Sequence, residues 1–339
     1  MNIYEIAEIA RVSPSTVSKV INGKGKISAV TRDKILTIMA QNDFHPKISS
    51  NASDNIAVFY RKSQGVIFAS SYANMVLSGI SGYFFDKEPN LLLISTDKIP
   101  SSRTEFQVFC HRNRVGGAIF LDLKSIDDYI IPISGVIPFV TLNAYFEGPQ
   151  IFNIMPDDFK GMHDALEYLW EMGHTKIAIS LLDQQYTSHY NRFAAYKKFH
   201  EEHHLPLEPD YILDDTKIQD MPFRMVYDSW VQKEKVPTAI VAMNDDTAVM
   251  IFSYLNIMGV RVPEDISIVG FDDYPYSIHL TPALTTVRQP TWEIGYLAGS
   301  IVESHMGGKP LSETEPTYFP MKEELIIRHS VKKLTSSHK

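Results

Sequence analysis

Small polar and basic side chains crowd one short stretch near the N-terminus, Ser13-Pro-Ser-Thr-Val-Ser-Lys-Val-Ile-Asn22. Apolar residues at helical spacing within it, Val17, Val20 and Ile21, would face inward. The members left on the outer face are Pro14, Ser15, Ser18, Lys19 and Asn22. Hydroxyl, amide and ammonium groups of this kind bind phosphate oxygens and the edges of bases. The stretch therefore has the chemistry of a nucleic-acid contact.

Three short helices would position this surface. Asn2 with Glu5 forms a capping-box pattern at the first helix, and Arg11-Val12 forms the turn after it. Ser13 can cap the second helix, where Pro14 at the first position needs no intrahelical partner for a backbone N–H. The core residues expected from helical spacing are Ile3, Ile6, Ala7, Ala10, Val17, Val20, Ile21, Val30, Ile35, Ile38 and Met39. A domain of this size fits the major groove of DNA through its second helix.

The charge distribution supports a DNA-binding head. Gly23 ends the second helix, Gly23-Lys-Gly-Lys26 forms a basic loop, and Ser28 can cap the third helix. Residues 1–48 carry seven basic and four acidic side chains, whereas the rest of the chain carries 25 and 36. A basic head on an acidic body confines the attraction for phosphate to one end. The alternative is a generic three-helix module that binds protein.

This stretch resembles the LacI/GalR family of bacterial repressors. The family has a Tyr on the first helix, then Ala, then Val-Ser-x-x-Thr-Val-Ser-Arg-Val-x-Asn, and this chain has Tyr4, Ala7, Ala10 and the run from Val12 to Asn22. The resemblance implies base contacts by Pro14, Ser15 and Lys19. It implies phosphate contacts by Tyr4, Ser13, Thr16, Asn22, Ser28 and Thr31. Ser18 and Lys26 complete the predicted DNA-binding set.

Lys19 departs from the family pattern, which has Arg at this position. Lysine reaches guanine O6 and N7 as a flexible point charge, whereas arginine offers a planar fork. We therefore expect a guanine contact that discriminates less sharply between bases.

Residues 47–55 form the predicted hinge after a head over residues 1–46. Family members continue with a helix that inserts a Leu into the minor groove. Pro46 is retained here, but Ser53 stands where the Leu is expected. Ser, Asn and Asp compete with helix formation, and a wedge that kinks DNA needs an apolar side chain. We expect a largely disordered hinge that bends the operator weakly; the alternative is a shifted register with another wedging residue.

The body over residues 56–330 is predicted to be two α/β lobes. Short apolar runs alternate with amphipathic stretches, a pattern typical of doubly wound parallel sheets. The predicted strands are 56–60, 91–95, 117–121, 139–142, 176–181, 239–243 and 266–270. The length suits two lobes, the second over about 157–285, and residues 331–339 form a tail. Ligands of such folds bind at the carboxyl ends of strands, here in a cleft between the lobes.

The LacI/GalR resemblance extends over the body. It rests on Asn244-Asp-x-x-Ala248, on the run from Leu255 through Val262-Pro to Asp273, and on Pro282-x-Leu-Thr-Thr-Val-Arg-Gln-Pro290. It implies an N-terminal all-α helix-turn-helix head and a body like that of type I periplasmic binding proteins. The same fold occurs in periplasmic sugar-binding proteins, so the fold alone does not decide function.

Six residues are candidates for effector binding. By the resemblance, four polar ones line the site: Asp157, Arg192, Asn244 and Asp272. A charged fork with carboxylates suits vicinal hydroxyls, which favours a sugar or sugar derivative; the alternative is that they only tie strand ends together. Phe223 could stack on a sugar face or belong to the core. Arg61, next to Lys62, could select a phosphorylated or carboxylated effector or lie on a solvated loop.

Other chemical signals are weaker. His200-Glu-Glu-His-His204 matches the H-E-x-x-H zinc pattern, but it falls where a helix is expected to end and no third ligand is evident. Cys110 is the only cysteine, which favours a reducing compartment. The N-terminus is not a signal sequence, and no apolar run approaches about 18 residues. We expect no enzyme activity, cofactor, metal or membrane contact.

The chain is identified as a member of the LacI/GalR family, which implies a cytoplasmic transcriptional repressor. A homodimer would bind a pseudo-palindromic operator, because a twofold protein reads twofold DNA. The tail lacks leucine heptads, so a dimer is predicted instead of a tetramer. A small-molecule effector would change DNA binding only if its affinity differs between two states. The alternatives are control by a protein co-regulator and a metalloenzyme centred on His200.

Overall fold

The computed structural model describes residues 1–42, 44, 55–61, 70–214, 218, 220–307 and 315–334. Most of the predicted hinge, with Ser53, lies outside the described residues, as do Pro46 and Lys62. The chain forms two compact units: unit 1 comprises Met1–Ile154 and Trp292–Phe319, and unit 2 comprises Met155–Thr291 and Pro320–Lys339. Over the described residues, no helix is long and apolar enough to cross a membrane.

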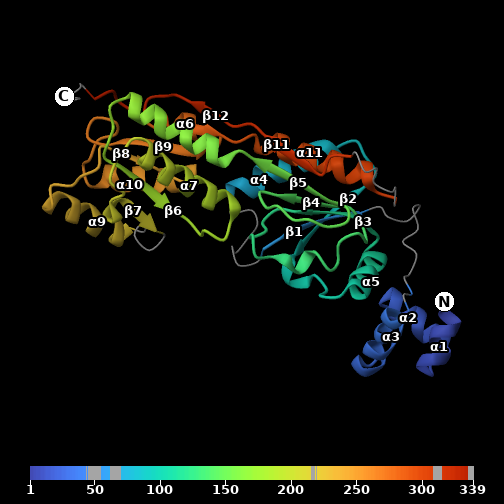
Figure 1. Ribbon diagram of the computed structural model, residues 1–339. Helices are drawn as coiled ribbons and strands as arrows, with labels where there is room; N and C mark the ends of the chain where they lie inside the picture. Colours follow the sequence, from blue (N-terminus) through green and yellow to red (C-terminus); the bar gives the residue numbers. More distant parts are fainter. Residues whose placement is uncertain are drawn as a thin grey trace. The chain divides into compact units, whose positions relative to one another are not determined.

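The head consists of α1 (Ile3–Ala10), α2 (Pro14–Asn22) and α3 (Ala29–Gln41) (Figure 1). The predicted caps are confirmed. Asn2 and Glu5 form the capping box of α1, and the Ser13 and Ser28 side chains accept hydrogen bonds from Thr16 N and Thr31 N. Gly23 ends α2 with φ at 63°, a left-handed conformation that suits glycine.

The core of the head differs from the prediction at one residue. Ile6, Val17 and Ile35 are buried together, but Val30 is 79% exposed and was wrongly assigned to the core. Val30 lies five residues before Ile35, which is about 140° around a helix of 3.6 residues per turn. The buried face of α3 is set by Ile35, Ile38 and Met39, and Val30 points away from it.

Unit 1 contains a six-stranded sheet in the order β11-β5-β4-β3-β1-β2. Its strands are β1 (Asn55–Tyr60), β2 (Asn90–Ser95), β3 (Val115–Phe120), β4 (Phe139–Leu142), β5 (Ile151–Pro156) and β11 (Tyr318–Met321). Its helices are α4 (Ser71–Phe84), α5 (Arg103–Asn113) and α11 (Thr291–His305). Strands β1 to β5 pair in parallel, as expected for a doubly wound sheet.

Unit 2 contains a second six-stranded sheet in the order β12-β10-β9-β8-β6-β7. Its strands are β6 (Ile177–Leu181), β7 (Ile212–Asp214), β8 (Ala239–Val241), β9 (Ser267–Asp272), β10 (Thr285–Arg288) and β12 (Glu324–Ile326). Its helices are α6 (Asp158–Glu171), α7 (Thr187–Glu202), α9 (Asp220–Gln232) and α10 (Asp245–Ile257). The described single-turn helices are η3 (Thr96–Lys98) and η4 (Asp128–Ile130) in unit 1, and η5 (Pro209–Tyr211) and η6 (Ser277–His279) in unit 2. Only β12 is antiparallel, to β10, among the described pairs of this sheet.

Helices cover both faces of the second sheet. Ile177 and Ile179 of β6 pack with residues of α6 and α7, whereas Ala178 between them packs with residues of α9 and α10. This alternation follows from the period of two along a strand. The predicted fold class of a helical head and two doubly wound parallel-sheet lobes is confirmed.

Two glycines let α4 and α11 of unit 1 meet backbone to backbone (Figure 1). A Cβ at Gly79 would clash with the carbonyl oxygen of Trp292, and a Cβ at Gly295 would clash with the carbonyl oxygen of Val76. Because the neighbouring atoms belong to the backbone, they cannot rotate away. Both positions therefore require glycine for steric reasons.

We expect Gly79→Ala to lower the free energy of unfolding by about 1–3 kcal/mol, because overpacking outweighs the helix propensity that alanine adds. Ser78→Ala, at the exposed neighbouring position of α4, is the matched control and should change it little. Chemical denaturation of the two full-length variants gives the comparison. Equal unfolding free energies would show that the helices can separate at no cost.

Candidate functional site

The predicted DNA contacts lie on the surface of the head. None of the eleven residues is buried, and Tyr4 is 72% exposed. Ser13 Oγ lies 2.8 Å from Ser15 Oγ and 2.9 Å from Thr16 Oγ1. Asn22 Nδ2 donates to the carbonyl oxygen of Ser18 at 2.8 Å. The start and end of α2 thus carry ordered polar groups that a DNA backbone could reach.

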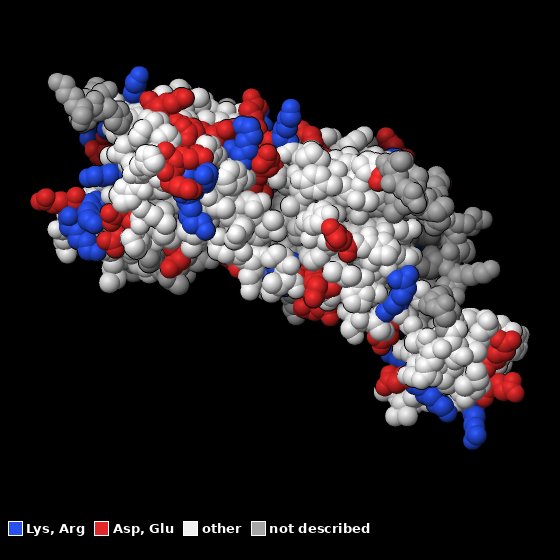
Figure 2. Space-filling view, viewed as in Figure 1, with Lys and Arg blue, Asp and Glu red and all other residues white. Residues whose placement is uncertain are grey.

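The described residues of the head carry a small net positive charge. Residues 1–42 contain six Lys or Arg and three Asp or Glu. Figure 2 shows blue and red side chains intermixed on the described part of the visible face, over both the head and the body. Attraction for phosphate therefore comes from a modest excess of positive charge, with Lys19, Lys24 and Lys26 all exposed near the end of α2.

A buried charged cluster lies at the carboxyl edge of the sheet of unit 2. Arg192 of α7 is its centre and is fully buried. The Arg192 guanidinium bonds Asp158 at the start of α6, with Nε 2.7 Å from Oδ1, and lies 3.6 Å from Asp272 Oδ1 at the end of β9. It also donates to the carbonyl oxygen of Met243 and stacks 3.6 Å from the ring centroid of Phe271.

Three carboxyl groups share this one guanidinium. Burial raises the pKa of Asp158 and of Glu323, and it raises the pKa of Asp272 to about 8. Burial alone would lower the pKa of Arg192, but the carboxylates outweigh it and the guanidinium stays charged. Desolvation is the main cause of these raised pKa values, and repulsion between the neighbouring carboxyl groups adds to it.

Two buried oxygens of the cluster lack hydrogen-bond partners among the described residues. Gln289 Nε2 donates to Glu323 Oε1 at 3.3 Å, which leaves Gln289 Oε1 and Glu323 Oε2 unpaired. Leaving such groups unpaired and buried costs about 1–3 kcal/mol each. A ligand that donates hydrogen bonds would remove that cost.

Asp245, buried in the first turn of α10, holds the loop that follows β9. It accepts hydrogen bonds from Tyr274 N at 3.1 Å, Ser277 Oγ at 2.5 Å and Thr286 Oγ1 at 2.6 Å. Burial raises its pKa to about 6. The loop begins at Asp272, whose φ of 115° is unfavourable for a residue with a Cβ and persists only in rigid surroundings. Asp245 is therefore a positioning residue for Asp272.

The structure brings two of the six predicted effector residues together, Arg192 and Asp272. Asp157 is exposed and caps α6 by accepting from Lys160 N, and Asn244 caps α10 by accepting from Thr247 N. Both stand beside the cluster in sequence, next to Asp158 and Asp245.

The other two lie elsewhere. Phe223 is fully buried, with its ring 6.4 Å from that of Trp230 and 5.8 Å from that of Tyr254, so it belongs to the core of unit 2. Arg61 lies in unit 1 and forms an ion pair with Asp127. Its positive charge is therefore balanced locally.

Sequence reasoning missed Asp158, Gln289 and Glu323. Asp158 sits in a tandem Asp pair of which only the first member was selected. Gln289 lies within the Pro282–Pro290 motif, where its residue type alone indicates no role, and Glu323 lies in Lys322-Glu-Glu324, a pattern typical of a solvated run. Only the fold brings Glu323 near enough to Arg192 for their charges to act on each other.

The H-E-x-x-H pattern does not form a histidine pair. His200 is buried, and its Nδ1 donates to the carbonyl oxygen of Pro206 at 3.0 Å. His204 is exposed, with a left-handed φ of 52°. Cys110 is also fully buried, and burial raises the pKa of its thiol.

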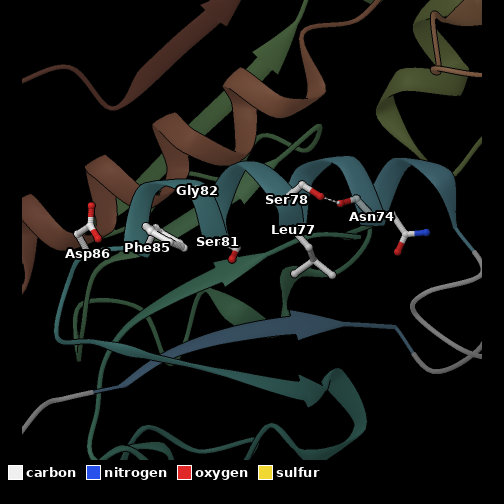
Figure 3. Close-up of a pocket in the computed structure, with 7 residues that line it drawn as sticks. All are labelled: Asn74, Leu77, Ser78, Ser81, Gly82, Phe85 and Asp86. Atoms are coloured by element: carbon white, nitrogen blue, oxygen red, sulfur yellow. Dashed lines mark hydrogen bonds between the residues drawn. The ribbon is translucent and has the colours of Figure 1, made fainter.

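A hollow lies on the surface of α4 in unit 1 (Figure 3). Its lining is mostly small or polar and comes from this helix and its end: Asn74, Leu77, Ser78, Ser81, Gly82, Phe85 and Asp86. Phe85 is 83% exposed. The hollow holds one carboxylate and no buried charge among its described lining residues, so it is a shallow surface and not a polar binding pocket.

Two family descriptions match the chain. Bacterial regulatory proteins of the lacI family match residues 2–47, and a periplasmic binding protein-like domain matches residues 166–331. The HTH-type transcriptional repressor PurR of Vibrio parahaemolyticus is 27% identical, over 98% of this chain and 99% of its own. The probable HTH-type transcriptional repressor ExuR of Bacillus subtilis is 28% identical, over 99% of this chain and 100% of its own.

Solved structures share the fold. The complex of the transcriptional regulator CelR with cellobiose has a TM-score of 0.69 and 21% identity, covering 97% of this chain and 99% of its own. The lac repressor dimer bound to operator and the anti-inducer ONPF has a TM-score of 0.67 and 22% identity, covering 98% and 99%.

Glu323→Gln should make stability less dependent on pH. The pKa of Glu323 is raised in the fold, so its stabilising contribution is complete below the ordinary value of 4.5 and is lost as pH rises toward the raised value. Glutamine cannot ionise and avoids this loss. The variant should gain about 1 kcal/mol or more over the natural chain between about pH 5 and pH 9.

Denaturant unfolding at a series of pH values measures the difference. Glu324→Gln is the matched control, because Glu324 is the exposed neighbour. Superimposable profiles for the natural chain and Glu323→Gln would contradict the argument.

Proposed function

The chain belongs to the lacI family of bacterial regulatory proteins, and on that premise we propose that it represses transcription as a homodimer on a pseudo-palindromic operator, under the control of a neutral polyhydroxy effector. The observation that carries the DNA-binding part is the capped pair α1 and α2 with its exposed polar face. The relatives named above are repressors, which supports regulation and not catalysis.

The groups exposed on α2 support direct reading of bases. Ser15 and Lys19 stand on the outer face while Val17, Val20 and Ile21 fill the core. The second helix of such a domain lies in the major groove with its N-terminal residues at base edges. The eleven predicted contacts remain the proposed DNA-binding set.

The composition of the buried cluster supports a neutral effector. Three carboxyl groups surround Arg192, and the unpaired Gln289 Oε1 and Glu323 Oε2 accept hydrogen bonds. A phosphate or carboxylate on the effector would add a further negative charge where three carboxyl groups already share one guanidinium, whereas sugar hydroxyls can bond these oxygens without adding charge. Arg61, already paired with Asp127, gives an anionic effector little support. The cellobiose bound by the similar regulator agrees with this class.

The proposed homodimer follows from the symmetry of the DNA. Two heads read an inverted repeat when the protein has a twofold axis. The hollow on α4, with small side chains beside the exposed Phe85, supports contact with a second copy of this chain there (Figure 3). A selected site that is an inverted repeat is the test of this symmetry.

Selection from a random DNA pool with the full-length chain tests the repressor proposal, and Lys19→Arg sharpens it. The chain should enrich an inverted repeat, and Lys19→Arg should strengthen one guanine preference by about 1 kcal/mol, because arginine binds guanine bidentately. Lys24→Arg, in the loop after α2, is the control. An unchanged preference in Lys19→Arg would show that Lys19 does not read a base.

Effector binding is tested by thermal stabilisation with neutral sugars, uronates and sugar phosphates. A neutral sugar should stabilise the natural chain, and Asp272→Asn should weaken its binding by about tenfold or more, because the amide keeps one of the two oxygens and a buried group left without its partner costs about 1–3 kcal/mol. Asp164→Asn removes an exposed carboxylate of α6 and should leave binding unchanged. Stabilisation by anionic sugars alone would contradict the effector class, and no response to any sugar would favour control by a protein co-regulator.

A further inference from the structure

Two histidines and two glutamates meet where α6 and α7 lie side by side in unit 2. His163 and Glu167 are one turn apart on α6, and Glu202 and His203 end α7. Residues four apart on a helix share a face, so His163 and Glu167 point the same way. None of these four residues belongs to the candidate effector site around Arg192.

The donor atoms form a continuous chain. His163 Nε2 lies 2.8 Å from Glu202 Oε2 and 3.8 Å from Glu167 Oε1. His203 Nε2 lies 2.7 Å from the same Glu167 Oε1. One donor atom from each of His163, Glu167 and Glu202 lies within 4.8 Å of the other two. Three side chains from two helices therefore bring Nε2 and carboxylate oxygens to one small volume, and His203 bonds Glu167 beside it.

Aromatic neighbours hold both imidazole rings in place. The ring of His163 stacks on that of Phe159 with 14° between the planes. The ring of His203 lies 4.1 Å from Trp170 and 4.7 Å from Phe199. Rings packed in this way lose little further freedom when Nε2 binds a ligand, which favours affinity.

We propose that His163, Glu167 and Glu202 form a site for a divalent transition-metal ion of the zinc class, which joins α6 to α7, and that His203 orients Glu167 as its hydrogen-bond partner. Imidazole nitrogen with carboxylate oxygen is a common zinc ligand set. Tetrahedral bonds of about 2.1 Å separate the ligand atoms by about 3.4 Å. The 2.8 Å pair of His163 and Glu202 must therefore open slightly, and these partly exposed side chains have room to do so.

The protons that now lie between imidazole and carboxylate would leave when the ion binds, because zinc ligands are deprotonated. Without an ion, the same groups form two surface hydrogen-bonded pairs. Exposed pairs of this kind contribute at most about 1 kcal/mol. Added zinc should therefore raise the melting temperature if the cluster binds metal, and should leave it unchanged if the side chains only pair with one another.

The site differs from the H-E-x-x-H pattern in the sequence. That pattern uses His200 and His204, of which one is buried and the other exposed. The structure instead brings together Glu202 and two partners on α6, His163 and Glu167, that no local pattern could indicate. It offers no catalytic arrangement, since the role of the ion here is to join two helices.

The same two helices carry the Asp158–Arg192 pair. Asp158 pairs with Arg192 across 34 residues and Glu167 pairs with His203 across 36, so α6 and α7 run in the same direction. An ion at one end would fix the register that the buried ion pair needs at the other. The proposal does not depend on the effector, because zinc binding is measured directly.

The test uses the full-length chain after chelator treatment, with Zn²⁺ alone as the probe in calorimetric titration. We expect one tight ion per chain and a higher melting temperature with Zn²⁺. The double variant His163→Gln/His203→Gln keeps side chains that can hydrogen-bond the glutamates and should bind at least about tenfold more weakly, since loss of even an outer-shell partner costs 10–100-fold. His204→Asn is the matched control, because asparagine tolerates the left-handed backbone there.

Equal Zn²⁺ affinity in the natural chain and the double variant would overturn the proposal. So would the absence of tight Zn²⁺ binding to the natural chain, or a loss of binding in His204→Asn that the double variant does not show. Fluorescence gives an independent readout. Cu²⁺ bound at the cluster should quench the fluorescence of Trp170, whose ring lies against His203. Trp170→Phe should remove this quenching of tryptophan fluorescence and leave Zn²⁺ binding unchanged. Melting of all variants without metal confirms that each one folds.

Discussion

The structure of unit 2 depends on one buried guanidinium. Arg192 joins the start of α6, the end of β8 and the end of β9 through Asp158, the carbonyl of Met243 and Asp272. Desolvating these charges is expensive, and only mutual pairing offsets the cost. Removing one partner would leave the others buried without compensation. The strand ends are therefore held in one arrangement by charge as well as by apolar packing, and this is the edge at which doubly wound folds bind ligands.

The same cluster shows how stability is given up at a candidate site. Three carboxyl groups surround one positive charge, and two oxygens have no partner among the described residues. A core selected for stability alone would satisfy each of these groups. An incompletely satisfied set of acceptors is stable only because Asp245 and the packed helices hold it, and it leaves binding energy for a ligand that donates hydrogen bonds.

The sequence predicted the elements governed by local rules. Helix caps in the head follow from Asn2, Ser13 and Ser28, and strands such as β1, β3 and β9 follow from apolar runs, although the prediction missed the buried strand β5. It failed where long-range packing decides. Val30 looks apolar but falls on the wrong side of α3, and β7 and β12 are only three residues long. The sequence could not distinguish Glu323 and Asp158 from acidic side chains that face solvent, because the residues that bury them lie far away in the sequence. The histidine cluster was missed for the same reason.

Cys110 has a practical consequence. It is the only sulfhydryl in the chain, it lies in the core of unit 1, and its raised pKa keeps it protonated at neutral pH. Thiolate is the reactive form, so reagents that modify cysteine should not react with Cys110 in the folded protein. A cysteine introduced on the surface of either unit would then be the sole attachment point for a fluorophore or spin label. Motions of the natural chain can be followed without first removing its own thiol.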